Sequence, residues 1–299
     1  MHATLSYLQA VVLGLVQGFS ELFPVSSLGH GVLVPALLGW NNLVSSQAST
    51  ESFFLVFLVG LHVGTALGLL VYYRRTWIDL VAGLARQIRR SRRDGVATLW
   101  RLNAPGVDPQ YRLLAILAIA TVPVGLAGLA LEKSLRVLFA KPLAAAVFLT
   151  LNGVILLLGE RLRGGQGRHA RRPHLDSLSV GRAFGIGIAQ ISALLAGISR
   201  SGVSMVAGLL GGLDHEDSAN FSFLLATPVI LLAGLYKLPS LLGPLGRGVR
   251  VQALVGALFA MGAAYVSVRF LVRWFTTRTL RPFAIYCLVI GVAAIVKFH

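Results

Sequence analysis

The sequence predicts an all-α polytopic membrane protein with two inverted-topology repeats, each a re-entrant helix pair followed by three transmembrane helices. The chain of 299 residues is 56% hydrophobic and 13% charged, with a mean hydropathy of +0.76. This composition is typical of an integral membrane protein rather than a soluble domain. Two polar segments of similar pattern interrupt the apolar sequence, and arginines gather in loops beside the apolar segments.

The first repeat is expected over residues 1–159. It begins with a re-entrant pair over 3–40, because this segment is long enough for two short helices and turns near Pro24–Ser27. Crossing hydrocarbon takes roughly 17–25 apolar residues. By that measure, the three full-length spans of this repeat lie at about 52–73, 113–131 and 143–159.

A basic linker, 160–182, separates this repeat from the second one, which is expected over 183–299. The second repeat begins with a re-entrant pair over 183–213 that turns near Gly197–Ser201. Its full-length spans are expected at about 219–238, 251–271 and 282–298. The two repeats and the linker form a single integral membrane domain.

The distribution of arginine orients the spans. If the arginine-rich segments 74–112 and 160–182 face the cytoplasm, the connection 132–142 lies outside and the basic stretch 269–281 lies inside. The first re-entrant pair then enters from the outside and the second from the inside. Non-helical turns are tolerated at membrane depth only inside protein or beside a cavity, so the two turns are expected to meet near the bilayer midplane.

The net charge of +16 does not indicate a nucleic-acid partner. The arginines follow the ends of apolar segments, where they contact anionic lipid headgroups, and no recognition fold or interleaved aromatic residues accompany them. The lipid bilayer is therefore the partner that this charge predicts.

The two polar segments are copies of one pattern. A shift of 173 residues aligns Gly14 with Gly187, and it brings further Gln, Ser and Gly positions into register. The copies differ in charge, since the first contributes Glu21 and His30 and the second contributes Arg200. A duplicated polar loop between apolar segments is costly unless it binds something.

Glu21 is the one acidic residue deep inside an apolar segment. A buried carboxylate costs several kcal/mol unless it is paired, protonated or bound to metal. One interpretation makes it a counter-ion of Arg200 for packing specificity, and the other makes it a metal ligand or a general acid or base. Gln17 lies one helical turn earlier on the same face, and two oxygens there suit a hard cation such as Mg²⁺ or Ca²⁺. We favour the functional interpretation.

Ser26, Ser27 and His30 follow a proline that ends the incoming helix. Either serine can cap the next helix, and a helix N-terminus with hydroxyl groups is suited to bind an anion. His30 follows Ser27 by three residues, so it is placed to accept the serine proton or to attack phosphorus itself. A capping role alone is the alternative. His62, by contrast, is interpreted as a satisfied core histidine.

The second turn surrounds Arg200 with Ser199, Ser201 and Gly202. The guanidinium matches two phosphate oxygens, and the small neighbours allow backbone N–H groups to approach. The segment lacks the Gly-Lys-Ser/Thr ending of a nucleotide P-loop. One carboxylate, one arginine and a Ser/His pair favour phosphoryl transfer, and a site inside the bilayer favours a lipid phosphate or diphosphate as substrate.

These segments resemble the undecaprenyl-diphosphatases, also called bacitracin-resistance proteins. Residues 17–30 resemble the family motifs [E/Q]-x-x-x-E and P-x-S-S-x-G-H, and residues 197–202 resemble its G-x-S-R-S-G loop. Further similar stretches cover nearly the whole chain. The resemblance implies a bacterial plasma-membrane enzyme that hydrolyses undecaprenyl diphosphate, depends on a divalent cation and opens its site toward the outer leaflet.

By matching position, the resemblance implies catalytic roles for Glu21, Ser27, His30 and Arg200, with Glu21 also binding metal. Substrate-binding roles are expected for Gln17, Ser26, Ser199, Ser201 and Gly202. Two departures affect the site: Gln17 stands where many members have a second glutamate, and Ala196 replaces the usual proline. The attacking group stays open among Ser27, His30 and water. A polyprenyl-phosphate flippase is the alternative function. The oligomeric state is left open, with a homodimer as one option.

Overall fold

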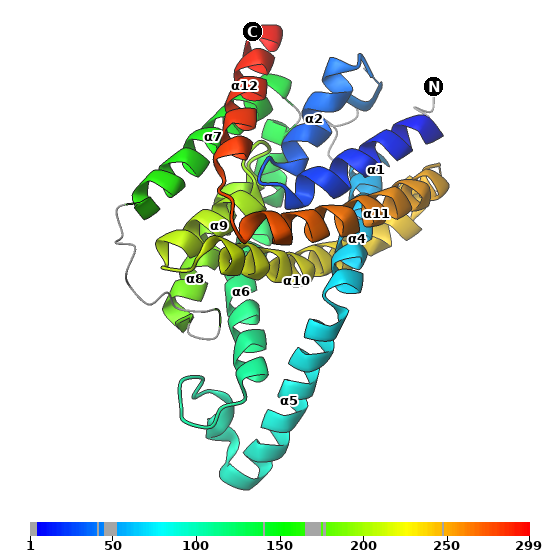
Figure 1. Ribbon diagram of the computed structural model, residues 1–299. Coiled ribbons are helices and arrows are strands. Elements are labelled where there is room, and N and C mark those ends of the chain that lie inside the picture. Colours follow the sequence, from blue (N-terminus) through cyan, green and yellow to red (C-terminus); the bar gives the residue numbers. More distant parts are fainter. Residues whose placement is uncertain are drawn as a thin grey trace.

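The computed structural model describes residues 5–40, 42–44, 53–139, 141–164, 175, 178–246 and 248–299. Across these ranges the chain is built from helices and turns, and no strand is formed (Figure 1). The predicted all-α class is therefore confirmed.

Six of the helices are long and apolar enough to cross a membrane, and they coincide with the six predicted spans. Each span has the length that hydrocarbon requires, which is why hydropathy located it. These helices are α4 (Phe53–Tyr72), α6 (Pro109–Phe139), α7 (Pro142–Gly164), α10 (His215–Leu242), α11 (Arg250–Phe275) and α12 (Arg281–Phe298).

The two re-entrant segments contain shorter helices. The first holds α1 (Tyr7–Leu22) and α2 (Ser27–Leu37), and the second holds α8 (Val180–Ala189), the 3₁₀ helix η3 (Gln190–Leu194) and α9 (Arg200–Leu210). With 10 to 16 residues, α1, α2, α8 and α9 are too short to cross hydrocarbon singly. A broken pair followed by three long helices thus occurs twice. The inverted orientation of the halves, and the boundaries 1–159, 160–182 and 183–299, stay predictions.

Each broken pair packs against a long helix of the other half. A Cβ on Gly14 of α1 would lie 2.4 Å from the carbonyl oxygen of Gly256 in α11. A Cβ on Gly187 of α8 would lie 2.5 Å from the carbonyl oxygen of Ala120 in α6. The two glycines that the 173-residue shift aligns therefore allow the same kind of close helix contact, which fixes both turns relative to the bundle.

The arginine-rich segment 74–112, interpreted from sequence as a loop, is instead a helical hairpin (Figure 1). Helix α5 (Arg74–Asp94) and the 3₁₀ helix η1 (Val96–Leu99) turn back onto the start of α6. Asp108 accepts hydrogen bonds from the backbone N–H groups of Gln110 and Tyr111, so it caps α6. The Arg86 side chain donates to the same carboxylate at 2.6 Å, and this bond lowers the pKa of Asp108. Polar caps thus stabilise a segment that composition alone had classed as a loop.

Candidate active site

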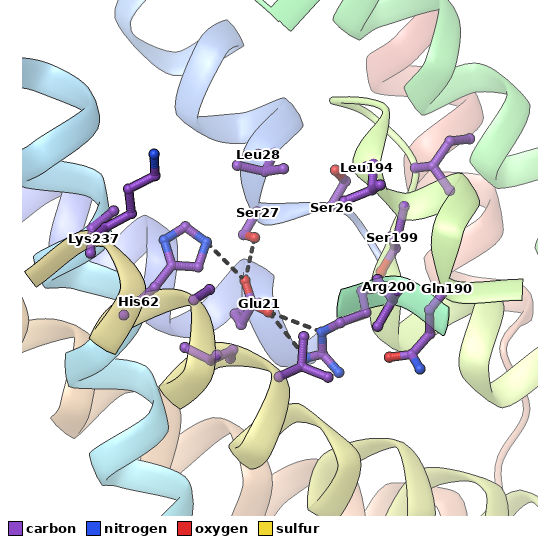
Figure 2. Close-up of a pocket in the computed structure, with 18 residues that line it drawn as sticks. Glu21, Ser26, Ser27, Leu28, His62, Gln190, Leu194, Ser199, Arg200 and Lys237 are labelled. Atoms are coloured by element: carbon purple, nitrogen blue, oxygen red, sulfur yellow. Dashed lines mark hydrogen bonds and ion pairs between the residues drawn. The ribbon is translucent and has the colours of Figure 1, made fainter. Parts of the chain in front are cut away.

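A cavity of about 260 Å³ lies where the two turns meet (Figure 2). Glu21, Ser26 and Ser27 line it from the first turn, and Ser199 and Arg200 line it from the second. Its remaining walls come largely from α10, η3 and α4 and are mainly apolar. Residues of both turns therefore line one cavity.

The two turns are held together by hydrogen bonds between their backbones and side chains. Ser26 Oγ accepts from the Gly29 N–H at 3.2 Å, which caps α2, and from the Gly197 N–H at 3.1 Å, which links the second turn. Asn152 of α7 joins both turns, because its amide donates to Pro24 O and accepts from Ser199 N–H, each at 2.9 Å. Because these hydrogen bonds are buried, they hold the two turns in a fixed position relative to each other.

Glu21 is the centre of the site. Arg200 donates to its Oε1 through Nη2 at 3.0 Å and through Nε at 3.3 Å. Gln17 donates to Oε2 at 3.0 Å, and the Ser27 hydroxyl donates to the same oxygen. A carboxylate has about four acceptor positions, so these four donors fill them. The buried charge is thereby neutralised, which corresponds to the alternative interpretation of Glu21 as a counter-ion of Arg200.

The predicted pairing of Ser27 with His30 is not formed. The His30 ring donates from Nδ1 to Ser26 O at 2.7 Å, and its Nε2 lies 2.8 Å from the hydroxyl of Tyr286 on α12. His30 is not among the cavity residues. Spacing of i, i+3 made the two side chains neighbours on α2, but the charged carboxylate is the stronger acceptor for the serine proton. Both nitrogens of His30 are engaged in positioning the first turn.

The predicted substrate-binding residues divide into two groups. Ser26 and Ser199 line the cavity. Gln17, Ser201 and Gly202 are placed behind it: Gln17 holds Glu21, Ser201 Oγ lies 3.2 Å from Phe23 O, and the Gly202 N–H donates to Ser199 Oγ at 3.1 Å. In this geometry the second group supports the residues that face the cavity.

His62 and Lys237 face the cavity, although the sequence interpretation gave them no role (Figure 2). The His62 ring donates from Nδ1 to Leu58 O at 2.8 Å, which leaves Nε2 directed to Glu21 Oε2 at 3.6 Å. No sequence signal pairs α4 with α1, so His62 was assigned to the core. Lys237 carried a signal in its spacing, because Val229, Ala233 and Lys237 recur every four residues on one face of α10.

The electrostatics of this cavity suit an anion. Ser27 is the first residue of α2 and Arg200 the first of α9, so two helix N-termini meet at the site. Helix N-termini favour negative charge, and a guanidinium fits two phosphate oxygens. The two positive charges of Arg200 and Lys237 outnumber the single negative charge of Glu21.

A divalent cation has no pre-formed site here. Within the described ranges, no group of three or more His, Cys, Asp or Glu side chains converges. Protein donors also occupy the acceptor positions of Glu21. The residues present therefore do not fit an Mg²⁺ or Ca²⁺ site made by the protein alone.

Comparison with known proteins identifies the family of this chain. Residues 10–293 match the family model described as "Bacitracin resistance protein BacA". An undecaprenyl-diphosphatase 2 of Frankia alni is 49% identical, and the match covers 100% of this chain and 99% of the relative. An undecaprenyl-diphosphatase of Mycolicibacterium paratuberculosis is also 49% identical, over 99% and 98% of the two chains. With a family match over nearly its whole length, this chain belongs to the BacA bacitracin-resistance protein family.

Proposed function

We propose that the protein is a membrane-embedded phosphatase that hydrolyses undecaprenyl diphosphate to undecaprenyl phosphate and phosphate, and so recycles the lipid carrier for cell-wall synthesis. The observation that carries this function is the linked set of Ser27, Glu21 and Arg200 around one cavity. A nucleophile, a proton acceptor and a phosphate-binding cation are the parts that phosphoryl transfer requires. A pure carrier needs charge complementarity but no nucleophile, so the flippase alternative leaves the bond between Ser27 and Glu21 without a role.

Arg200 couples substrate binding to the chemistry. Without substrate its guanidinium pairs with Glu21 at 3.0 Å. A diphosphate in the cavity competes for the same donors, because its oxygens match the guanidinium fork. When Arg200 turns to the phosphate, Glu21 loses two of its four donors and becomes a better proton acceptor. The carboxylate is therefore activated by the arrival of substrate.

Ser27 is the attacking group in this scheme. Its Oγ forms a bond to the terminal phosphorus while its proton passes to Glu21, and the bond from that phosphorus to the bridging oxygen breaks to release undecaprenyl phosphate. Glu21 passes this proton to the departing undecaprenyl phosphate. It then takes a proton from the water that attacks the phosphoserine and returns it to the leaving Oγ, so that hydrogen phosphate is released. His30 does not compete for this role, because its two nitrogens are directed to Ser26 and Tyr286.

The geometry supports an opening toward the outer side of the bacterial plasma membrane. The cavity extends along α10 from Val229 to Lys237, near the end of that helix, and along α4 toward Val59. The arginine distribution assigns the ends of both helices in this direction to the outside.

Variants of Ser27 and of Tyr286, the partner of His30, test this assignment. Ser27→Ala is expected to lower kcat for phosphate release from undecaprenyl diphosphate by at least about 1,000-fold, because it removes the nucleophile. Tyr286→Phe removes one partner of His30 and is expected to lower kcat by no more than about tenfold, the value of one hydrogen bond. A folded Ser27→Ala protein that retains wild-type kcat would reject serine attack. If folded wild type releases no phosphate with Mg²⁺ or Ca²⁺, lipid-phosphate translocation in vesicles becomes the function to measure.

We propose that the divalent cation expected from the family resemblance would bind together with the diphosphate, and that Glu21 would be the protein carboxylate available to hold it. Mg²⁺ is commonly bound by one or two carboxylates plus substrate phosphates. Calorimetric titration of detergent-purified protein with Mg²⁺ is therefore expected to show no saturable binding at millimolar concentration, and binding is expected once a diphosphate lipid is present. Tight binding of Mg²⁺ to the protein alone, lost in Glu21→Gln, would contradict this proposal.

A further inference from the structure

A second cavity, of about 470 Å³, lies at the C-terminal end of α11 and shares no residue with the candidate active site. Its walls come from the last turns of α11 and from the connection to α12. We call it the α11 groove; its basic residues are Arg269, Arg273 and Arg278, and its apolar residues are Val266, Phe270 and Trp274. The proposed hydrolysis gives this groove no role.

The α11 groove is apolar on the side that lies toward the middle of the helix. Val266 and Phe270 are one turn apart on the same face of α11, and they are 57% and 47% exposed. Trp274 follows one turn later, with its ring centre 5.7 Å from that of Phe270. Exposed apolar side chains of a spanning helix face lipid chains, and tryptophan is enriched where the chains meet the headgroups. This part of the groove is therefore suited to contact acyl chains.

The α11 groove is strongly basic on the side that lies toward the end of the helix. Arg269 and Arg273 are exposed and one helical turn apart. Arg278 lies beyond the last residue of α11, and its guanidinium is 5.9 Å from the ring centre of Trp274. The sequence contains no Asp or Glu after Asp217. Within the described ranges, no carboxylate from another segment forms an ion pair with these three arginines, so an occupant of the groove meets their full charge.

The order of apolar and basic residues decides which occupant fits. A soluble anion satisfies the arginines but leaves Val266 and Phe270 exposed. An anionic phospholipid matches both ends, because its acyl chains contact the apolar residues while its phosphate accepts from the guanidinium groups. The arginine distribution assigns this end of α11 to the cytoplasmic side, so such a lipid comes from the inner leaflet.

We propose that the α11 groove binds one anionic phospholipid of the inner leaflet, whose phosphate is held by Arg269, Arg273 and Arg278. Phosphatidylcholine carries the same phosphate, but its quaternary ammonium is repelled by three positive charges. The groove therefore selects lipids by the charge of the headgroup. This site is separate from the catalytic cavity and does not depend on the proposed hydrolysis.

Native mass spectrometry of the detergent-purified full chain tests the site, because it resolves the first bound lipid and gives its dissociation constant. Phosphatidylglycerol is expected to bind at least about tenfold more tightly than phosphatidylcholine with the same acyl chains. Glycerol 3-phosphate, which has the phosphate but no acyl chains, is expected not to displace phosphatidylglycerol at equal concentration. Equal affinities for the two lipids would overturn the proposal, and displacement by glycerol 3-phosphate would reject a lipid as the occupant.

Two double variants distinguish the groove from the overall charge of the protein. Arg269→Gln, Arg273→Gln should weaken phosphatidylglycerol about 30-fold, because each arginine strengthens anionic-lipid binding about fivefold, and should leave phosphatidylcholine unchanged. Both side chains are exposed, so this protein should keep the wild-type unfolding midpoint. Arg89→Gln, Arg93→Gln is the matched control, since these arginines are also exposed and one turn apart, on α5. It should leave the first dissociation constant unchanged. Equal weakening by the two double variants would show that the lipid responds to net charge alone and would reject the groove.

Discussion

Arg200→Ala is expected to abolish phosphate release and to destabilise the fold by about 3–5 kcal/mol, because removing one partner of a buried ion pair leaves the other charge unpaired. Glu21 is 7% exposed, and Arg200 supplies two of its four hydrogen bonds. Thermal unfolding in detergent should show a midpoint lower by roughly 10 °C. The loss of activity follows separately, since no other guanidinium lines the cavity within the described residues.

The double variant Glu21→Gln, Arg200→Ala separates these two effects. Neutralising residue 21 removes the unpaired charge, so most of the lost stability should return, while phosphate release stays absent. If the double variant is as unstable as Arg200→Ala, the charge of Glu21 is not the cause of the instability. If Arg200→Ala retains phosphate release, Arg200 does not bind the diphosphate.

Among substitutions that add one methyl group to the second turn, Gly197→Ala is expected to be the most destabilising. Gly197 has φ = 119°, a conformation that side chains rarely adopt, and a Cβ there would lie 2.5 Å from Ala145 O and 2.6 Å from Leu149 N. Backbone cannot move aside as a flexible side chain can, so α7 and the turn must separate. The cost should be at least about 3 kcal/mol from strain and overpacking together.

Gly185→Ala is the matched control, because a Cβ at Gly185 meets nothing within 4 Å. It replaces a helical glycine of α8 and should leave stability unchanged or raise it slightly. The measurement is the yield of folded protein and its unfolding midpoint in detergent. A Gly197→Ala protein as stable as the Gly185→Ala protein would show that the second turn is not closely packed against α7.

Sequence located the six spans and the contact between Gln17 and Glu21 because each depends on a local feature. The six spans follow from length and hydropathy. The contact between Gln17 and Glu21 follows from i, i+4 spacing on one helix. The pairing of Glu21 with Arg200 was only the alternative interpretation, although the two polar turns supply one carboxylate and one guanidinium and a buried charge requires a partner.

The rest of the site depends on packing between distant segments, which spacing does not encode. Ser27 had two acceptors within reach, His30 on its own helix and Glu21 on another, and only the approach of α1 to α2 decides between them. His62 reaches Glu21 because α4 packs on α1. Helix α5 was missed because its arginine content was interpreted as that of a loop, although its charged and apolar residues lie on opposite faces with helical spacing.

The first residues of α2 and α9, Ser27 and Arg200, are related by the 173-residue shift that aligns the two polar segments. A protein assembled from two identical halves would carry the same residue at both positions, either two serines or two arginines. Neither arrangement contains both a nucleophile and a phosphate-binding cation. If the halves arose by gene duplication, this chemistry could therefore begin only after the copies had diverged. When both copies are fused in one chain, the first can keep Ser27 while the second keeps Arg200, so one site contains both residues.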